Sequence, residues 1–455
     1  MHIRDLNGKT VCILGFGKEG RSTLAALRKY APTAEVTIAD QAKKEDGRRK
    51  TEETNVRWQT GGDYLHNLDR FDVIIKSPGI PPSSQLTAHS SQLTSATQIF
   101  LDSIADSGAT VIGVTGSKGK STTASLIHHI LHAAGKDAHL VGNIGKPVLD
   151  YLERAKPNTF FVQEMSSAQL MDLTTSPHTA VITSFFPEHL DYHGSVDAYQ
   201  EAKRHITRFQ GAADAVFFNR HSKGAQAIAE ESPGKRTPFG PEDAPLRIEE
   251  THLIGEHNLG NIAGAFAVAM HVGIDRATAL DAIATFTPLP HRLQSLGIHH
   301  GIEWIDDAIS TTPESTIAAL DALGDRVATV ILGGTDRGLD FTSLGKRIAH
   351  SPVRTVILFP GSGPRIRKAI EEAMPPPPLP ARTEHPSPHG GGAGGEGAQE
   401  ICFFDAPSMA DAVAHAKQHT PQGMICLLST ASPSYNMFKN FEEKGEVFQR
   451  EISVL

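Results

Sequence analysis

The stretch Gly113-Val-Thr-Gly-Ser-Lys-Gly-Lys-Ser-Thr-Thr123 decides the fold of this chain, because it joins a strand end, a glycine turn and a helix start. The preceding residues, 109–114, form a β-branched run that predicts a strand, and residues 121–134 have a helical pattern. Backbone N–H groups around Gly116 and Gly119 can face phosphate oxygens at the start of such a helix. The order strand, glycine loop, helix therefore predicts a nucleoside triphosphate site.

The loop differs from the standard phosphate-loop pattern G-x-x-x-x-G-K-[ST], since valine stands at position 114 where the pattern has glycine. Lys120 is predicted to bind the outer phosphates and Ser121 a magnesium ion. The alternative is a glycine-rich turn that only caps a helix. The predicted ATP-binding residues of the loop are Gly116, Ser117, Lys118, Gly119, Lys120, Ser121 and Thr122.

The composition is typical of a globular protein that does not bind nucleic acid. The 455 residues suggest about three domains. The hydrophobic content is 39%, the charged content 21% and the net charge −8, with no lysine- or arginine-rich face to attract nucleic acid. The N-terminal residues lack an apolar signal core, and no apolar run reaches the length of a membrane span, so we expect a cytoplasmic protein. Cys12, Cys402 and Cys426 each lie in a strand-like run and are expected to be buried.

Strand-like runs alternate with helical patterns along almost the whole chain, which predicts an α/β protein built from parallel sheets covered by helices. We expect three units: an N-terminal domain at 1–99, a central ATP-binding domain at 100–287 and a C-terminal domain at 288–455. Within the last, residues 375–400 form a proline-rich and then glycine-rich insertion with few apolar residues. This insertion is expected to be disordered, and we assign it no function.

A glycine motif, Gly15-Phe-Gly-Lys-Glu-Gly20, follows the first predicted strand, and Asp40 ends the next one. This is a dinucleotide-binding fingerprint, in which a tight turn and a helix start face a diphosphate and the acid faces a hydroxyl. Any diphosphate nucleotide fits it, including a UDP-sugar. A dehydrogenase that binds NAD at this motif is one alternative, although it would leave the phosphate loop unexplained.

Two polar residues follow strand ends of the central unit. Glu164 ends the apolar run 160–166, where open α/β sheets place ligands, and a carboxylate near a phosphate loop is a natural magnesium ligand. His189 follows another strand, in the segment 185–195. A lone histidine is usually structural, and His189 is a ligand candidate only because Glu164 also follows a strand end of this unit.

Lys203 lies on the apolar side of a predicted helix, 195–210, for which Ser195 is a plausible N-cap. Its neighbours on the apolar stripe are Tyr199 and Ile206. Loss of hydration there lowers the pKa of a lysine toward the neutral amine, which can react with carbon dioxide to give an anionic carbamate ligand for magnesium. The alternative is a lysine that extends its amine from the edge of the stripe into water.

Other candidates stand later in the chain. Asn258 and Asn261 share one face of a predicted helix, which suits amide contacts to a base or phosphate. Arg292 lies at the junction of the second and third units and is a candidate for a phosphate contact. Asp307 follows a short strand and is a candidate for a ribose contact.

Taken together, these motifs resemble the Mur ligase family, the ATP-dependent amide ligases of peptidoglycan precursor synthesis. The resemblance covers the chain outside 375–400, and it is strongest to the members that add D-glutamate to UDP-N-acetylmuramoyl-L-alanine. The stretches that carry it are GFGKEGRS (15–22) with SPGI (77–80), TGSKGKSTT (115–123), HNLGN (257–261) with PHR (290–292), and LLSTASPSYNMFKNFEEKG (427–445). The last stretch separates these members from sibling ligases that add other amino acids.

The resemblance implies a three-domain architecture, with Rossmann-like N- and C-terminal domains around a central phosphate-loop ATPase domain, and a role for each matching residue. Lys120, Glu164, His189 and Lys203 would be catalytic, with Lys203 carbamylated. Two magnesium ions would be held by Ser121, Glu164, His189 and Lys203. ATP would also contact Asn258, Asn261, Arg292 and Asp307. The UDP-sugar site would be lined by Lys18, Glu19, Asp40, Gln41, Gly79, Asn143 and His189. D-glutamate would be held by Thr311, Arg337, Ser434 and Phe441.

The chain departs from the family pattern at three places. Ile309 stands where some members have lysine, so no cationic role is assigned there. The pair Lys18-Glu19 is more charged than in some members, and Arg337 replaces a lysine while adding bidentate geometry.

The implied reaction is an acyl-phosphate ligation by a monomer that needs no nucleic acid or membrane partner. The terminal carboxylate of UDP-N-acetylmuramoyl-L-alanine would attack the γ-phosphate of ATP, and the amine of D-glutamate would then displace phosphate. Two alternatives remain: a phosphate-loop switch or motor, and a Mur-type ligase that adds another amino acid, such as L-alanine or a diamino acid.

Overall fold

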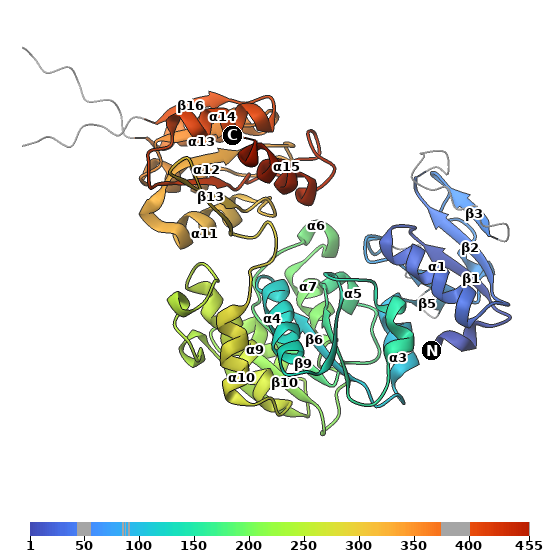
Figure 1. Ribbon diagram of the computed structural model, residues 1–455. Helices are drawn as coiled ribbons and strands as arrows, with labels where there is room; N and C mark the ends of the chain where they lie inside the picture. Colours follow the sequence, from blue (N-terminus) through green and yellow to red (C-terminus); the bar gives the residue numbers. More distant parts are fainter. Residues whose placement is uncertain (43–55, 84–85, 87, 90–91, 375–400, 455) are drawn as a thin grey trace, which may run out of the picture. The chain divides into compact units, whose positions relative to one another are not determined.

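The computed structural model describes residues 1–42, 56–83, 86, 88–89, 92–374 and 401–454, and these form three β-sheets (Figure 1). The insertion 375–400, which we expect to be disordered, lies outside the described residues. The first sheet has the order β3-β2-β1-β4-β5, and its neighbouring strands run parallel. Its strands are β1 (Thr10–Leu14), β2 (Glu35–Asp40), β3 (Arg57–Thr60), β4 (Val73–Lys76) and β5 (Leu93–Thr94).

The second sheet is also parallel, with the order β11-β10-β9-β6-β8-β7. The strands β7 and β8 lie on one side of β6, and the later strands β9, β10 and β11 lie on its other side. The strand order thus reverses at β6, and open α/β sheets bind ligands at the carboxyl end of such a point. The strands are β6 (Thr110–Thr115), β7 (Asp137–Gly142), β8 (Thr159–Glu164), β9 (Thr179–Ile182), β10 (Ala215–Asn219) and β11 (Lys235–Phe239).

The third sheet has the order β12-β13-β17-β14-β15-β16. Five of its strands are parallel, but β12 pairs with β13 in the antiparallel sense, which corrects the expectation of purely parallel sheets. Only a short turn separates these two strands, so no crossover helix can form between them. The strands are β12 (Gln294–His299), β13 (Ile302–Asp306), β14 (Val327–Leu332), β15 (Thr355–Leu358), β16 (Cys402–Asp405) and β17 (Ile425–Leu428).

Helices connect and cover the strands. In the part with the first two sheets they are α1 (Lys18–Tyr30), α3 (Ala96–Ile104), α4 (Lys120–Ala133), α5 (Ser167–Leu170), α6 (Leu190–His193), α7 (Val196–Arg204), α8 (Lys223–Ala229), α9 (His257–His271) and α10 (Arg276–Thr285). With the third sheet they are α11 (Pro313–Leu323), α12 (Thr342–Ala349), α13 (Gly363–Ala373), α14 (Met409–His419) and α15 (Phe441–Ser453). Short 3-10 helices are η1 (Ile3–Leu6), η2 (Leu68–Arg70), η4 (Val148–Arg154), η5 (Pro241–Asp243), η6 (Ile248–Glu250) and η7 (Gly324–Arg326).

The chain divides into two compact units. The first contains Met1–His252 with Glu256–Phe286, and the second Leu253–Gly255 with Thr287–Leu455. The first two sheets belong to one unit because a single apolar core joins them, as in the edge-on contact of Phe100 and Phe161 with ring centroids 5.1 Å apart. The division of this unit into separate domains near residue 99 stays a prediction.

The second unit has a sheet with apolar side chains on both faces, as expected for a sheet between two helical layers (Figure 1). The helices α11, α12 and α13 pack on one face through residues such as Leu320 and Leu344. The helices α14 and α15 pack on the other, where Phe448 meets Trp304 with ring centroids 5.8 Å apart.

The expectation of three buried cysteines is wrong at one position. Cys12 and Cys426 are buried in inner strands, but Cys402 is exposed. The physical reason is position in the sheet: Cys402 begins β16, which is an edge strand. The strand-like pattern of a sequence does not distinguish an edge strand from an inner one.

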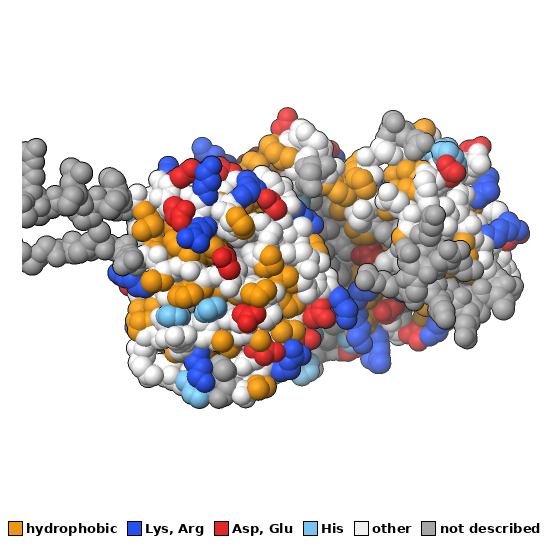
Figure 2. All heavy atoms as spheres, turned by 90° about the horizontal axis from the view of Figure 1, so that it is seen from above, with side chains coloured by type: hydrophobic (Ala, Val, Ile, Leu, Met, Phe, Trp, Pro, Cys, Tyr) orange, Lys and Arg blue, Asp and Glu red, His pale blue; other side chains and the backbone are white. Residues whose placement is uncertain are grey.

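The described surface carries charges of both signs. On the face shown in Figure 2, acidic and basic side chains are interspersed rather than gathered into a basic patch. None of the helices in the described ranges is both long and apolar enough to pass through a membrane.

Candidate functional site

The phosphate loop lies where the sequence predicts it, between β6 and α4 at the carboxyl edge of the second sheet. Glycine is required at two of its positions. Gly116 has a φ of 154°, and a Cβ there would overlap Thr183 Oγ1; Gly119 has a φ of 85°, and a Cβ there would overlap Asn261 Oδ1. The loop is thus closely packed against the segment after β9 and against α9.

The loop is held by its own backbone and by Ser184. The backbone N–H of Ser117 donates to Ser184 O over 3.0 Å, and that of Lys118 donates to Ser184 Oγ over 2.9 Å. The Nζ of Lys120 donates to the carbonyl of Ser117 over 2.8 Å. The first N–H groups of α4, which begins at Lys120, have no acceptor within the helix and so form an anion-binding end.

Lys203 is buried directly behind this loop. Its residue is 1% exposed, and its Nζ donates to the carbonyl of Gly116 over 3.0 Å and to Thr115 Oγ1 over 3.3 Å. The amine also lies 4.8 Å from the centroid of the Tyr199 ring. The predicted stripe is therefore correct: Tyr199 and Ile206 are buried with Lys203, and the Ser195 hydroxyl caps α7. The helix ends at Arg204, earlier than the predicted position 210.

Burial and charge together favour a neutral amine at Lys203. Desolvation lowers the pKa of Lys203 well below its usual value, and the nearby cation Lys120 lowers that pKa further. Glu188 and Glu164 act in the opposite direction, so four ionisable groups meet around the loop. Glu188 also forms an ion pair with Lys118 over 2.9 Å. Sequence analysis did not identify Glu188 as a site residue, although its position next to His189 could have indicated it.

Glu164 ends β8 as predicted and is 1% exposed. Its Oε1 accepts a hydrogen bond from Asn143 Nδ2 over 2.8 Å, whereas its buried Oε2 has no hydrogen-bond partner among the described residues. A buried carboxylate oxygen without a donor fits a cation. Within the described ranges, no three side chains of His, Cys, Asp or Glu gather as a metal cluster. The predicted ligand set contains only two such residues, Glu164 and His189, beside a serine and a modified lysine.

His189 is exposed and has a left-handed backbone, with a φ of 54° at the start of α6. Its ring centroid lies 6.2 Å from that of Tyr199. A different histidine, His193, lies closer to Tyr199 at 5.3 Å and shares a hydrogen bond of 2.9 Å with Ser167 Oγ. The structure thus brings His189 to the neighbourhood of the helix that carries Lys203.

Asn258 and Asn261 lie at the start of α9 and are nearly buried. The amide of Asn261 donates to Asn258 Oδ1 over 2.8 Å, and Asn261 Oδ1 accepts from Thr123 Oγ1 over 3.2 Å. The second amide therefore lies against the phosphate loop and the first turn of α4, as a nucleotide contact requires.

The glycine motif of the first sheet is held by Asp40. One carboxylate oxygen accepts from the backbone N–H of Phe16 over 2.7 Å, and the other from that of Ala42 over 2.9 Å. The two charged residues of the motif reach residues associated with the second sheet: Lys18 Nζ donates to Gly145 O over 2.9 Å. These bonds order the turn from the first strand and fix its position.

Glu19 makes the second such link, because its carboxylate accepts from Gln169 Nε2 over 2.7 Å. Burial raises the pKa of Glu19, and the hydrogen bond from Gln169 opposes that rise. Two further predicted residues of the UDP-sugar site, Gln41 and Gly79, are exposed at the carboxyl ends of β2 and β4. Five residues of the predicted set therefore lie at the carboxyl ends of strands of the first sheet, whereas Asn143 and His189 follow strands of the second.

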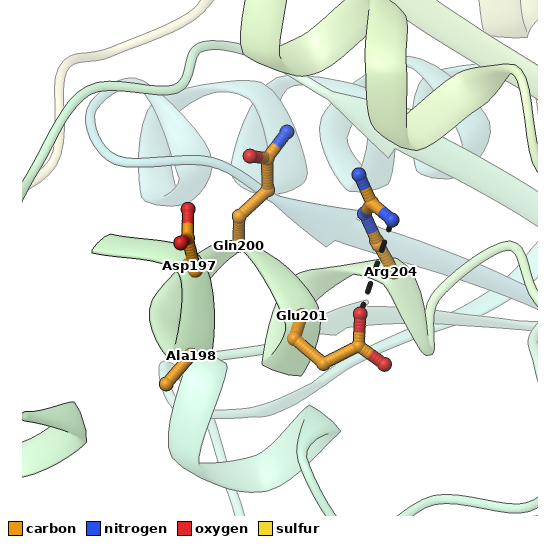
Figure 3. Close-up of a pocket in the computed structure, with 5 residues that line it drawn as sticks. All are labelled: Asp197, Ala198, Gln200, Glu201 and Arg204. Carbon is orange, nitrogen blue, oxygen red and sulfur yellow. Dashed lines mark ion pairs between the residues drawn. The ribbon is translucent and has the colours of Figure 1, made fainter. Parts of the chain in front are cut away.

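The outer side of α7 differs from the side that carries Lys203. Asp197, Gln200, Glu201 and Arg204 line a surface pocket there, and Arg204 forms an ion pair of 3.9 Å with Glu201 (Figure 3). The α7 helix is strongly amphipathic, because polar side chains cover its outer face and the amine of Lys203 is buried on the opposite face. Lys203 thus has its amine on the buried side of α7, whereas these four polar residues line the outer side.

In the second unit, Asp307 is buried directly after β13. Its carboxylate accepts from Ser429 Oγ over 2.8 Å and from the backbone N–H of Leu293 over 3.2 Å. Burial raises the pKa of Asp307 to about 6, although these bonds and the nearby Arg292 oppose the rise. Asp307 and Arg292, both predicted nucleotide contacts, are thus close in space.

Two predicted glutamate-binding residues lie on loops that are bonded to each other. The backbone N–H of Thr335 donates to the carbonyl of Pro433 over 2.6 Å, which joins the loop after β14 to the loop after β17. The guanidinium of Arg337 lies 5.5 Å from the ring centroid of Tyr435, next to Ser434. The structure therefore brings Arg337 and Ser434 to the carboxyl ends of two adjacent strands.

The other two lie on neighbouring elements of the same unit. Thr311 follows Ser310, whose carbonyl accepts from Thr430 Oγ1 over 3.2 Å. The ring of Phe441, the first residue of α15, has its centroid 6.3 Å from that of His291. His291 in turn shares a buried hydrogen bond of 2.8 Å with Asp306, and this contact raises the pKa of His291.

A buried lysine of this unit was missed from the sequence. Lys444 is 0% exposed, and its Nζ donates to Thr430 Oγ1 over 2.6 Å and to Ser434 Oγ over 2.9 Å. Burial lowers the pKa of Lys444 to about 7, against the opposing effect of Asp306 and Asp307. The only sequence signal was its place before Gly445 at the end of the C-terminal pattern.

The first comparison with known proteins concerns the part of the chain around the phosphate loop. Residues 114–245 match the model of the Mur ligase middle domain. This range includes the phosphate loop, Glu164, His189 and Lys203.

Two relatives are similar over nearly the whole chain. A Salinispora tropica protein named UDP-N-acetylmuramoyl-L-alanine--L-glutamate ligase is 34% identical, with 99% of each chain covered. A Symbiobacterium thermophilum protein named UDP-N-acetylmuramoylalanine--D-glutamate ligase is 31% identical, with 96% of each chain covered.

Solved structures show the same fold. The MurF ligase of Thermotoga maritima, crystallised in complex with ADP, has a TM-score of 0.57 at 14% identity, with 100% of this chain and 97% of that chain covered. The three sheets observed here therefore form the three-domain architecture of these ligases. The full-length identities and the matching middle domain show that this chain belongs to the Mur ligase family.

Proposed function

We propose that this chain joins glutamate to UDP-N-acetylmuramoyl-L-alanine at the expense of ATP, in the synthesis of peptidoglycan precursors. The observation that carries the proposal is a fully buried lysine, Lys203, whose amine contacts the carbonyl of Gly116 in the phosphate loop. A switch or motor that only hydrolyses ATP has no use for such a group. A dehydrogenase accounts for neither the lysine nor the loop. The substrates are proposed from the names of the full-length relatives.

The configuration of glutamate has two candidates. The C-terminal stretch 427–445 predicts D-glutamate, and relatives named for D-glutamate, at 29% and 31% identity, support it. One observation favours L-glutamate: relatives named for L-glutamate reach 34% identity over 99% of the chain. Ile309, which stands where some family members have lysine, lies close to Thr311 and is consistent with a different amino-acid site.

In the proposed ATP site, the N-terminal end of α4 binds the phosphates. Lys120 exchanges its bond to the Ser117 carbonyl for the outer phosphates, so that its positive charge offsets the charge that develops during transfer. Asn261, which already contacts the first turn of α4, positions the nucleotide with Asn258. Arg292 and Asp307 are proposed as further ATP contacts.

Magnesium and a carbamate on Lys203 belong to the same proposal. Ser121, Glu164, His189 and the modified Lys203 would hold two ions, and the buried Glu164 Oε2 without a donor fits this role. Bound magnesium supplies Lewis-acid stabilisation of the phosphoryl oxygens. The low pKa of Lys203 supports carbamylation, because only the neutral amine reacts with carbon dioxide.

The remaining substrates are assigned to the first and third sheets. In the UDP-sugar site, Asp40 orders the glycine turn, while Lys18 and Glu19 fix that turn to Gly145 and Gln169 rather than reading the uracil. Gln41, Gly79, Asn143 and His189 complete the proposed set. Thr311, Arg337, Ser434 and Phe441 are proposed to hold glutamate, with Arg337 opposite a carboxylate.

The proposed reaction has two steps. The terminal carboxylate of UDP-N-acetylmuramoyl-L-alanine attacks the γ-phosphate of ATP, which gives an acyl phosphate and ADP. The amine of glutamate then attacks the acyl carbon, the amide bond forms, phosphate leaves and the amine loses a proton. Exclusion of water protects the acyl phosphate between the steps. We further propose that the enzyme acts as a cytoplasmic monomer.

The test is phosphate release and product analysis with ATP, magnesium and UDP-N-acetylmuramoyl-L-alanine. D-glutamate, L-glutamate, L-alanine and a diamino acid are added one at a time. A new amide product with one enantiomer of glutamate supports the proposal and decides the configuration. Product with another amino acid moves the specificity within the family. Phosphate release that does not depend on any amino acid contradicts ligation.

A further inference from the structure

The hydrogen bonds of Lys444 join it to a residue of the proposed amino-acid site. Its Nζ lies 2.9 Å from Ser434 Oγ and 2.6 Å from Thr430 Oγ1, and all three residues are buried. The charged ammonium form, which Asp306 and Asp307 favour, has only donors, so both hydroxyl oxygens accept from it. Each hydroxyl is left with its own proton to donate elsewhere.

The two hydroxyl protons have different destinations. The Thr430 hydroxyl proton is shared between two carbonyls of the protein, Ser432 O at 2.9 Å and Ser310 O at 3.2 Å. The structure gives the Ser434 hydroxyl proton no acceptor among the described residues, while its oxygen is occupied by Lys444. A hydroxyl in this state has its proton available to donate to a ligand.

The surroundings of Ser434 are closely packed. A Cβ on Gly334 would lie 3.3 Å from Ser434 Oγ, so the loop after β14 packs against this hydroxyl. The same two loops are joined by Thr335, whose hydroxyl donates to Asn436 Oδ1 over 3.2 Å. The Ser434 hydroxyl and the Arg337 side chain therefore start from loops that are fixed to each other.

We infer that Lys444 is a positioning residue for the amino-acid substrate: its bond to Ser434 Oγ directs the Ser434 hydroxyl proton toward a substrate carboxylate. The inference rests on the proposed function, because it takes Ser434 as a substrate contact. A carboxylate accepts hydrogen bonds only, and it therefore matches a serine whose hydroxyl proton is available.

A purely structural role accounts less well for a lysine at this position. Burying an ammonium is unfavourable, and well-packed apolar residues often stabilise a core as well as buried charges do. Asp306 and Asp307 favour the charged form of Lys444 through their negative charge, whereas the hydrogen-bond acceptors of its amine among the described residues are the two hydroxyls. The position of the amine is thus explained by the hydroxyls that it orients.

The experiment compares Lys444→Met, Ser434→Ala and the double variant with the wild-type chain. Lys417→Met is the matched control, since Lys417 is exposed on α14 of the same unit. The KM values for amino acid, ATP and UDP-N-acetylmuramoyl-L-alanine are measured with kcat, and thermal unfolding shows whether each variant folds. Lys444→Arg keeps a donor at the site and serves as the conservative variant.

We expect Lys444→Met to raise the KM for the amino acid about tenfold or more, with less than a twofold change in the other two KM values. Ser434→Ala should have a similar effect, and the double variant should be little worse than either single one, because both remove the same donor. Lys444→Arg should recover part of the loss, and Lys417→Met should match the wild type. Unchanged KM for the amino acid in a folded Lys444→Met, equal losses for all three substrates, or fully additive losses would each overturn the inference.

Failure of the proposed function is recognised separately. If the wild-type chain ligates an amino acid other than glutamate, the same ratios of KM values are measured with that amino acid, because each carries a carboxylate.

If Lys444→Met does not fold, Lys444→Gln replaces it, since its amide still donates but carries no charge. An amino-acid KM for Lys444→Gln between those of Ser434→Ala and the wild type supports the inference. A Gln variant with all three KM values raised equally overturns it.

Discussion

Lys203 in the first unit and Lys444 in the second are both fully buried lysines, but their partners differ. The amine of Lys203 donates to a backbone carbonyl and a threonine hydroxyl, with the cation Lys120 nearby. The amine of Lys444 donates to two hydroxyls, with Asp306 and Asp307 nearby. Both pKa values are lowered by burial. At Lys203 the cation Lys120 lowers the pKa further, against Glu188 and Glu164, whereas at Lys444 the neighbouring charges named, Asp306 and Asp307, both favour the charged donor. These surroundings fit the proposed carbamylation of Lys203 and the proposed orientation of the Ser434 hydroxyl by Lys444.

The largest effect is expected at Lys203. Replacing it in Lys203→Ala removes the amine that would carry the carbamate, and we expect kcat to fall by about a hundredfold or more. A small carboxylate such as formate, added at high concentration, should restore part of the activity by standing in for the carbamate. The measurement is product formation with and without formate.

Lys223→Ala is the matched control, because Lys223 is an exposed lysine on the neighbouring helix α8. It should keep wild-type turnover with or without formate. Near-normal activity of Lys203→Ala would remove the distinction between the two buried lysines.

A second test concerns the loop in front of Lys203. Gly119 and Gly135 both have positive φ, 85° and 70°, so alanine costs about 1–2 kcal/mol of backbone strain at either position. Only at Gly119 would the new Cβ also overlap Asn261 Oδ1, since nothing lies within 4 Å of a Cβ on Gly135. We expect Gly119→Ala to raise the KM for ATP about tenfold, and Gly135→Ala to leave it unchanged, in steady-state kinetics.

Equal KM values for ATP in the two glycine variants would mean that the contact between the loop and Asn261 has no part in nucleotide binding. Similar losses of thermal stability in both would still be expected, because the strain is common to them. The pair thus separates backbone strain from the site itself.

The charge state of Lys444 gives a third test, this time of stability. The folded-state pKa is about 7 and the ordinary value is 10.5, so between these values the unfolded chain binds more protons than the folded one. Stability from this group therefore rises with pH through that window, by up to about 1.4 kcal/mol per pH unit. We expect the unfolding free energy of the wild type, relative to Lys444→Met, to increase from about pH 7 to pH 10 in urea titrations.

Parallel stability curves for the wild type and Lys444→Met over that range would show that the amine does not titrate there. The nearby carboxylates of Asp306 and Asp307 would then hold the lysine charged throughout. Such a result would enlarge the difference between Lys444 and Lys203 rather than reduce it.

The sequence predicted the first region better than the second, for physical reasons. The phosphate loop and the stripe of α7 are local patterns, so Lys203 could be placed among apolar neighbours from spacing alone. The helix α15 contains many charged residues, and nothing in its local pattern distinguishes the buried Lys444 from the exposed Arg450. The contacts of Glu19 with Gln169 and the edge position of β16 depend on pairing between distant segments, which one sequence does not reveal.

The smallest effect is expected at Arg337, the exposed cation of the proposed amino-acid site. Arg337→Lys keeps the charge but loses the bidentate geometry and the flat contact with the Tyr435 ring, so we expect the KM for the amino acid to rise about threefold to fivefold. Tyr435→Ala removes only the ring contact and should raise the KM less than Arg337→Lys, while Tyr435→Phe should leave the KM unchanged.

Arg337 is exposed and Ser434 is buried, so added salt should reduce the KM increase of Arg337→Lys but not that of Lys444→Met. Equal salt dependence of the two variants would mean that the amino-acid carboxylate meets both groups in the same exposed surroundings.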